Sequence, residues 1–372
     1  MNLRKLARRL HLWSSLSIGA FLVLLSLSGA ALVYYVEIDR FLHPALDVSS
    51  QSPDWDRALS TLRTVYPDKT GPWRFEVTED KGAIPARYYN PIEKQGQGFA
   101  PMMVWLSPDG TQILRRDYWG DYLATWFYNL HFQLLMGKTG EVIVGYLGLC
   151  SVLVLLTGLM SWWPKVGQWR KGLSFKRRSA MIGRLYDWHK IIGLIFLLPL
   201  LLLSLTGTML ALPDETKAIL NLFSKVEKPS ATAVLNIKPS VTPSVAASTA
   251  LLAIPNARLA WIETPPKVGG GYRMRLQVEG DPSHRFPQSY VYVDAGTGEV
   301  TSVFDITRQG ASNKILNWLH PLHDGSVFGS FGRVLWLLTG VSCLLLFVLG
   351  LWRYVLRHRG RRLKPSRAMS RA

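Results

Sequence analysis

The sequence is poor in acidic residues and cysteines, and it lacks the common nucleotide-binding and hydrolytic motifs. Only 25 Asp and Glu residues oppose 43 Lys and Arg residues, which gives a formal net charge of +18. No GxGxxG or GxxxxGK[ST] segment is present, so no dinucleotide or P-loop site is expected. Neither HExxH nor a Ser-His-Asp pattern points to hydrolysis. The two cysteines, Cys150 and Cys343, lie inside apolar runs, so neither a disulfide nor a CxxC metal site is expected.

Long uncharged apolar runs are what the chain does contain. There are four of them, at Leu12–Val36, Val142–Trp163, Ile191–Pro213 and Val334–Leu351. Each reaches the roughly 17 residues that a helix needs to cross a bilayer core. The first run is longer than the roughly 7–15 apolar residues of a signal peptide, so a transmembrane helix is favoured over a cleaved leader. The runs therefore predict four transmembrane helices.

The basic surplus is concentrated beside these runs. Twenty basic residues and one acidic residue, Asp187, lie in three segments: residues 1–11, 164–190 and 353–372. Basic residues flanking spans mark the cytoplasmic side. We therefore expect an inner-membrane protein with both termini in the cytoplasm and two long periplasmic segments, 37–141 and 214–332. Contact with membrane lipid explains the basic charge, and no nucleic-acid partner is expected.

The first and third apolar runs repeat one pattern. His11 precedes the SLSG sequence at Ser26–Gly29, and His189 precedes the SLTG sequence at Ser204–Gly207. The interval from the histidine to the first serine is identical in the two copies, and so is the interval to the glycine. The chain is therefore predicted to consist of two repeated halves, as in many membrane proteins.

The second and fourth runs repeat a different pattern. Each carries two glycines at one common spacing: Gly148 with Gly158, and Gly340 with Gly350. His131 precedes the first glycine of its run by the same interval as His323 precedes its counterpart. The short words NLH and NWLH instead align His131 with His320. The spacing to the glycines favours His323 as the counterpart of His131, and both His320 and His323 stay candidates.

The two periplasmic segments show the same order of predicted elements. Each begins with a helix and continues with short strands bounded by Gly, Pro and Asp turns. The first is predicted to hold a helix at 55–66 and strands at 73–77, 102–106 and 112–114; the second a helix at 245–252 and strands at 258–263, 272–278, 289–293 and 300–304. Two small α+β modules result.

The predicted fold class is a membrane α-helical protein with four transmembrane helices in two repeated halves and two periplasmic α+β modules. Amphipathic segments at 121–135 and 313–322 are predicted to lie on the membrane surface. The predicted organisation is a first span (1–36), a first module (37–120), an interfacial helix with the second span (121–163), a basic cytoplasmic loop (164–190), a third span (191–213), a second module (214–310) containing a linker at 227–243, an interfacial helix with the fourth span (311–355) and a basic tail (356–372).

Four histidines occupy equivalent positions at membrane edges, and topology sorts them into pairs. His11 and His189 lie at the predicted cytoplasmic ends of the first and third spans. His131 and His323 precede the predicted periplasmic ends of the second and fourth spans. A single interfacial histidine is usually an anchor, but four in matched register favour bis-histidine haem ligation between helices. Zinc is disfavoured, because neither face gathers a closed ligand set. Candidate partners for haem propionates are cationic: Arg184, Lys190, Lys138 and Arg333.

Several words in the sequence resemble one known family. They are LHLW with SLSG, LHFQLL with GEVIVG, DWHKIIG with SLTG, and LHPLHDG with FGRVLWLLTG. They resemble the PepSY-associated transmembrane family of iron-regulated inner-membrane proteins, and in particular dihaem siderophore-iron reductases of the ferrioxamine-utilisation type. The resemblance implies PepSY-like modules, two haem b groups per chain and ligand positions at His11, His131, His189 and His323. The doubled histidine of LHPLHDG keeps His320 as an alternative.

The resemblance implies a haem-dependent reductase that passes electrons across the membrane to a ferric siderophore and releases iron as Fe(II). The electron donor is expected to be quinol or a separate cytosolic reductase, and Tyr118, Trp119 and Tyr122 are expected to be exposed aromatic contacts for the chelate. The alternative is a non-enzymatic PepSY-type binding or regulatory protein. A permease is disfavoured, because no intramembrane charge or broken helix is expected to form a midplane site.

Overall fold

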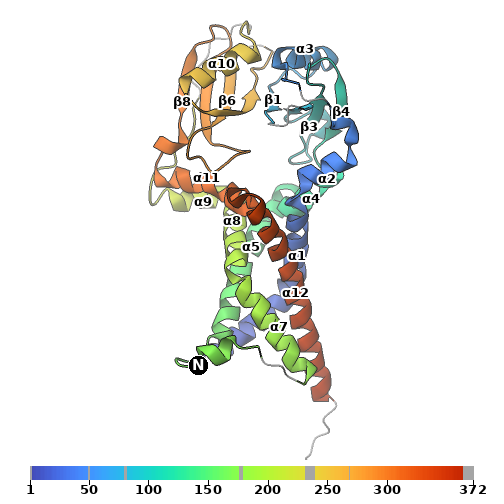
Figure 1. The fold of residues 1–372 in the computed structure, drawn as a ribbon, viewed down its shortest axis with the longest axis vertical. Helices are drawn as coiled ribbons and strands as arrows, with labels where there is room; N and C mark the ends of the chain where they lie inside the picture. Colours follow the sequence, from blue (N-terminus) through green and yellow to red (C-terminus); the bar gives the residue numbers. More distant parts are fainter. Residues whose placement is uncertain are drawn as a thin grey trace, which may run out of the picture.

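A bundle of long helices carries a β-sheet domain at one end, and the N-terminus lies at the other end (Figure 1). The computed structural model describes residues 2–48, 51–78, 82–175, 179–230, 239–267 and 269–362. Residues 176–178 of the predicted basic loop, 231–238 of the predicted linker and 363–372 of the predicted tail lie outside the described residues.

Three helices are each long and apolar enough to cross a membrane. They are α1 (Leu3–Leu32), α5 (Gly137–Trp162) and α12 (Gly329–Arg362). Two further helices, α7 (Met181–Ile195) and α8 (Leu197–Ala211), meet the same criterion as a pair. The described residues thus hold three spans, or up to four if the pair counts as one, which identifies a membrane protein.

The third span differs from its prediction in two ways. The sequence predicts an unbroken span from residue 191, but α7 and α8 meet at a bend of 59° and α7 begins at Met181. Pro199 explains the bend, because it lacks an N–H and its ring clashes with the carbonyl of Ile195 one turn earlier. The polar residues between 184 and 190 hide the first turns of α7 from a search for apolar runs. The expectation that no helix is broken is therefore wrong.

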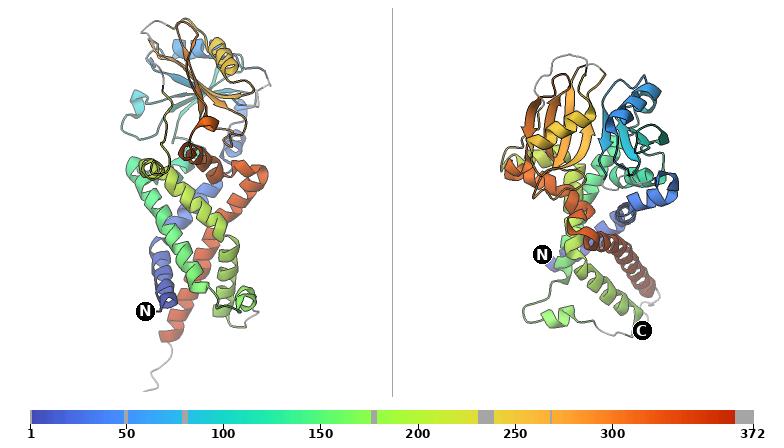
Figure 2. Two further views of the ribbon diagram at one scale, coloured as in Figure 1. Left: turned by 90° about the vertical axis from the view of Figure 1, so that its left-hand side faces the viewer. Right: turned by 45° about the horizontal axis from the view of Figure 1, so that its top comes forward.

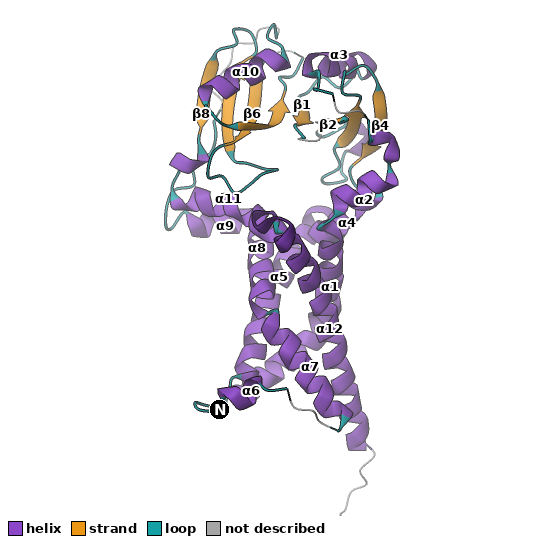
Figure 3. Cartoon of the chain, viewed as in Figure 1, coloured by secondary structure: helices purple, strands orange, loops and turns teal. Residues whose placement is uncertain are grey.

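The sheet is a single antiparallel sheet of eight strands (Figures 1 and 3). Its order is β4-β3-β2-β1-β5-β6-β7-β8. The strands are β1 (Trp73–Glu76), β2 (Ile84–Tyr88), β3 (Met102–Leu106), β4 (Ile113–Tyr118), β5 (Arg258–Glu263), β6 (Gly271–Gln277), β7 (Ser289–Asp294) and β8 (Val300–Phe304). Seven of them match predicted strands in position, and β2 is the one that the sequence analysis did not predict.

The two predicted modules are not separate, because their first strands pair with each other. Phe75 of β1 is opposite Ile262 of β5, which joins two four-stranded halves into one sheet. Helices α3 (Trp55–Val65) and α10 (Pro243–Ala253) cover the same face, and one hydrophobic core runs beneath both. Trp73, Phe75 and Tyr272 are among its fully buried side chains. The two predicted α+β modules are therefore the two halves of one shared domain.

Two helices lie between the sheet and the bundle, α4 (Leu123–Gln133) and α11 (Ala311–Asp324) (Figure 2). Both confirm helices that the sequence predicted. The remaining short helices are α2 (Tyr35–Leu42), α6 (Trp169–Leu173) and α9 (Pro213–Leu220), with 3-10 turns η1 (Pro44–Leu46), η2 (Ile92–Lys94), η3 (Ile306–Arg308) and η4 (Ser326–Phe328). Of these elements, α2 contacts the sheet, since Asp39 pairs with Arg115 of β4.

Candidate functional site

At the end of the bundle away from the sheet, the structure brings His11 of α1 together with His189 of α7. Their ring centroids are 6.2 Å apart and the rings are nearly perpendicular, at 76°. Each Nδ1 lies within hydrogen-bond distance of a main-chain carbonyl on a neighbouring span: His11 at 3.0 Å from the oxygen of Val154, and His189 at 2.9 Å from the oxygen of Leu346. We call these two residues the inner pair.

At the end of the bundle near the sheet, His131 of α4 meets His323 of α11. Their ring centroids are 6.1 Å apart, with an interplanar angle of 36°. The Nδ1 of His131 lies 2.8 Å from the Leu25 carbonyl oxygen and 3.3 Å from the Ser28 hydroxyl, and the Nδ1 of His323 lies 3.0 Å from the Thr206 hydroxyl. We call these two residues the outer pair.

The hydroxyl groups at the outer pair act as acceptors. Thr206 already donates its hydroxyl proton to the carbonyl of Leu202 at 2.7 Å, and Ser28 donates to main-chain carbonyls in the same way. The hydroxyls are therefore free to accept the Nδ1 proton of His323 and His131. In all four rings the surroundings thus favour the tautomer with the proton on Nδ1, which leaves Nε2 as the basic nitrogen.

Glycines explain how the four rings fit between the helices. Each ring packs against a glycine of another helix: His11 against Gly158, His189 against Gly350, His131 against Gly29 and His323 against Gly207. A Cβ added at Gly29 would lie 2.7 Å from Cε1 of its histidine, and one at Gly207 would lie 2.9 Å away. These are the glycines of the repeated sequence patterns. The repeated spacing of these glycines in the sequence therefore corresponds to the positions where the rings pack.

The two pairs fit axial ligation of a haem iron. Metal–imidazole bonds of about 2 Å on each side, together with the radius of each ring, separate the centroids of two opposed imidazoles by roughly 6 Å. The observed separations agree with this value. Within the described part of the chain no group of three or more His, Cys, Asp or Glu side chains forms a metal site. Each pair offers two imidazoles, which is the donor set of bis-histidine haem ligation.

The structure places the two histidines of LHPLHDG in different surroundings. His323 belongs to the outer pair, whereas Nδ1 of His320 lies 3.1 Å from a carboxylate oxygen of Asp324. The His320 ring packs against Phe286 of the sheet domain, with centroids 4.8 Å apart. His320 thus faces the junction with the sheet and is not part of either pair. The spacing of the repeat, and not the short motif NWLH, therefore identifies His323 as the partner of His131.

Several other candidate residues are engaged differently from what the sequence suggested. Trp119, expected to be exposed, is only 6% exposed, and its Nε1 donates to Asn129 at 3.2 Å. Three of the cations expected to meet propionates have partners within the protein: Arg333 donates to the Val33 carbonyl and Glu37, Lys190 to the Ser174 carbonyl and Lys138 to Glu141. Their role toward a propionate stays a prediction.

A cluster of arginines that the sequence alone did not reveal lies on the sheet face turned toward the bundle. They come from β1, β2 and β6 and from the loop after β6: Arg74, Arg87, Arg273, Arg275 and Arg285. The available signal was the alternation of charged and apolar residues in WRFE and YRMRLQ, which places Arg and Glu on one face.

Comparison with known proteins gives one positive finding. The model of the family described as "PepSY-associated TM region" matches residues 8–357, which covers nearly the whole chain and includes both the spans and the sheet domain. A comparison with curated proteins finds no match.

Proposed function

We propose a function from the premise that this chain belongs to the PepSY-associated transmembrane family. We infer that it is a dihaem reductase of the inner membrane, which passes single electrons to a ferric siderophore in the periplasm and releases iron as Fe(II). The observation that carries this proposal is the presence of two histidine pairs, each with the spacing of opposed axial ligands.

The separation of the two pairs supports a path across the membrane. Helix α1 carries His11 of the inner pair near its start, and Gly29, which seats the outer pair, near its end. At about 1.5 Å per residue, the stretch of helix between these two positions covers roughly 27 Å, close to the roughly 30 Å of a bilayer core. One pair therefore belongs near each membrane face. Haem held at each pair would supply reversible one-electron transfer.

The residues of the chain have distinct parts in this function. The imidazoles would hold the metal through Nε2, because the carbonyl and hydroxyl acceptors direct the proton to Nδ1. The apolar spans would exclude water from the path, and the sheet domain would position the chelate beside the outer pair. The electron donor is proposed to be quinol or a separate cytosolic reductase.

The contacts also support four spans arranged as two repeated halves. In one half, His11 of α1 packs on α5 and His131 packs on α1; in the other, His189 of α7 packs on α12 and His323 packs on α8. We propose that α7 and α8 together form the span equivalent to α1. The N-terminus and α6 lie at the end away from the sheet (Figures 1 and 3), and their basic residues support a cytoplasmic location for that end and a periplasmic location for the sheet.

The test is to purify the protein in detergent after expression with ample haem supply and to record oxidised and reduced absorption spectra. We expect two low-spin haems per chain, together with reduction of a ferric siderophore once the protein itself has been reduced. A colourless protein would overturn the proposal and favour a membrane-anchored PepSY-type binding protein that regulates a periplasmic partner.

A further inference from the structure

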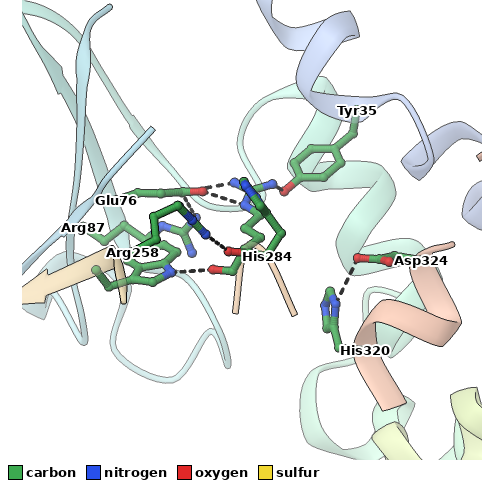
Figure 4. Close-up of polar contacts among 9 residues, drawn as sticks. Tyr35, Glu76, Arg87, Arg258, His284, His320 and Asp324 are labelled. Carbon is green, nitrogen blue, oxygen red and sulfur yellow. Dashed lines mark hydrogen bonds and ion pairs between the residues drawn. The ribbon is translucent and has the colours of Figure 1, made fainter. Parts of the chain in front are cut away.

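The sheet has two chemically different faces. One face packs on α3 and α10 and is apolar. The opposite face contacts the junction helices, because Arg285 in the β6–β7 loop donates to the Tyr35 hydroxyl of α2, and Phe286 packs on His320 of α11. Figure 4 shows this junction. Arg74 is paired with Arg87 on one side and with Glu263 on the other, and Glu263 is paired with Arg273, so the strand arginines share this second face.

Positive charge exceeds negative charge in the arginine cluster. Glu263 accepts hydrogen bonds from both Arg74 and Arg273, the latter at 2.7 Å. Glu76 likewise accepts from Arg87 at 3.0 Å and from Arg285 at 2.6 Å. Two arginines therefore share each carboxylate, so each group of three keeps one unit of positive charge.

The fifth arginine adds to this surplus. Nη2 of Arg275 donates to the Tyr290 hydroxyl at 2.7 Å, and this partner is neutral. The pKa of Arg74 lies below its ordinary value, chiefly because burial disfavours the charged form, and the charges of Arg273 and Arg275 act in the same direction. The five arginines thus outnumber the two carboxylates, although the charge of Asp324 also acts on Arg285. Arg87 is buried, so the positive surface is formed by the partly exposed Arg74, Arg273 and Arg275.

Aromatic rings hold the guanidinium groups in place. Arg74 lies 4.2 Å from the ring centroid of Tyr89, and Arg275 lies 5.1 Å from that of Tyr290. The side chains of Arg74 and Arg273 are each 29% exposed, so both are partly buried and partly accessible to solvent. Fixed, partly desolvated guanidinium groups bind anionic oxygen atoms more strongly than mobile surface charges do.

We propose that this arginine face binds a ferric chelate that carries net negative charge, such as a tris-catecholate complex. The inference rests on the proposed reductase function and names its class of substrate. Charge complementarity favours an anionic chelate over a neutral tris-hydroxamate complex. The location suits the function, because the loop that carries Arg285 contacts His320, which lies one helical turn before His323 of the outer pair.

The test uses gallium(III) complexes, which resemble the ferric complexes but are not reduced. Binding of gallium tris-catecholate and of neutral gallium tris-hydroxamate to the detergent-purified protein is measured by calorimetry. We expect the anionic complex to bind about tenfold more tightly or better, because only its net negative charge is attracted to the arginines and its hydrogen bonds have both partners charged. This advantage should shrink as salt screens the surface. Equal binding of the two complexes would overturn the proposal.

Variants locate the binding surface. Replacing Arg273 and Arg275 together by Gln should weaken binding of the anionic complex by about tenfold or more. Arg116→Gln is the matched control, since Arg116 lies on β4 of the same domain, is exposed and stacks on Tyr118 with its guanidinium 5.3 Å from the ring centroid. Unchanged affinity in the double variant would refute the assignment, as would displacement of the complex by inorganic phosphate at equal ionic strength.

These outcomes are separate from those of the proposed function, because binding of a gallium complex needs no haem. A protein that contains two haems and reduces the chelate, but in which the arginine variants bind normally, would refute only the surface. A protein without haem that still binds the anionic complex through these arginines would refute only the reductase.

Discussion

The inner and outer pairs have the same spacing but different surroundings. Within the described residues, the inner rings have main-chain carbonyls as their Nδ1 partners; His11 lies on the membrane-length helix α1, and His189 lies on α7 of the bent pair α7 and α8. The outer rings also meet the hydroxyls of Ser28 and Thr206, and their histidines lie on α4 and α11, outside the membrane-length helices. The inner pair is thus held by the spans alone, whereas the outer pair is held at the junction with the sheet.

Under the proposed function, this difference gives different roles to the inner pair and the outer pair, which we call the two levels. In that function, an inner site held only by spans would receive electrons in a geometry that binding at the sheet domain does not alter. The outer site lies on elements that also contact the sheet domain, since His320 on α11 packs on Phe286. Under the proposed function, the outer level is therefore the one that binding of a chelate can influence. If the two pairs are independent, a change at one pair should leave the other pair intact.

The largest expected effect comes from removing one ligand at a time. His131→Ala should lower the haem content from two per chain to about one and abolish chelate reduction, because one imidazole does not replace two at the iron. His11→Ala should remove the other haem, with its own spectral component. Haem content and reduced-minus-oxidised spectra measure both effects.

His320→Ala is the matched control for these variants, because its ring bonds to Asp324 and not to the outer pair. It should keep both haems. Loss of a haem in His320→Ala with both haems kept in His323→Ala would contradict the assigned pairing. If each variant that removes one histidine ligand lost both haems, the two levels would not be independent.

A smaller effect is expected from filling the space beside each ring. An added Cβ at Gly29 would lie 2.7 Å from His131, whereas one at Gly350 would lie 3.4 Å from His189, an ordinary contact. Gly29→Ala should therefore displace the outer ring at a cost of about 1–3 kcal/mol and weaken haem retention. Gly350→Ala should keep its haem and gain up to about 1 kcal/mol from helix propensity. Retention of each haem during mild heating measures the contrast, and equal loss at both sites would contradict it.

Much of the site was predictable because its signal is one of spacing. The histidines and glycines recur at fixed intervals, so His11, His131, His189 and His323 could be identified before their partners were known. Seven strands were also predictable, because alternating apolar residues mark a sheet with one buried face. The pairing of the histidines followed from topology, which sorts them by membrane face.

The remaining features depend on interactions that a linear pattern does not encode. Pro85 conceals β2, because proline usually argues against a strand, yet it lies there opposite Trp105. The pairing of β1 with β5 joins segments from opposite halves of the chain, and no local pattern predicts which strand edges meet. The arginine face exists only once that pairing has formed, so a linear reading of the chain does not reveal it as a surface.

The smallest expected effect concerns the hydroxyl groups that distinguish the two pairs. Ser28→Ala removes an acceptor 3.3 Å from Nδ1 of His131, and the ring keeps its bond to the Leu25 carbonyl, so haem should be retained. A neutral hydrogen bond contributes about 0.5–1.5 kcal/mol, which corresponds to roughly 20–60 mV for a one-electron couple. The outer potential should rise, because losing an acceptor makes the imidazole a weaker donor to the oxidised iron.

Potentiometric titration of the two haems measures this shift. Ser17→Ala is the matched control, because Ser17 also lies on α1 and its hydroxyl bonds to the carbonyl of Trp13. The inner potential should not move in either variant, since the rings of the inner pair bond to main-chain carbonyls that neither change removes. If the two variants move both potentials alike, the hydroxyls do not distinguish the levels, and the difference between the pairs must come from their helices instead.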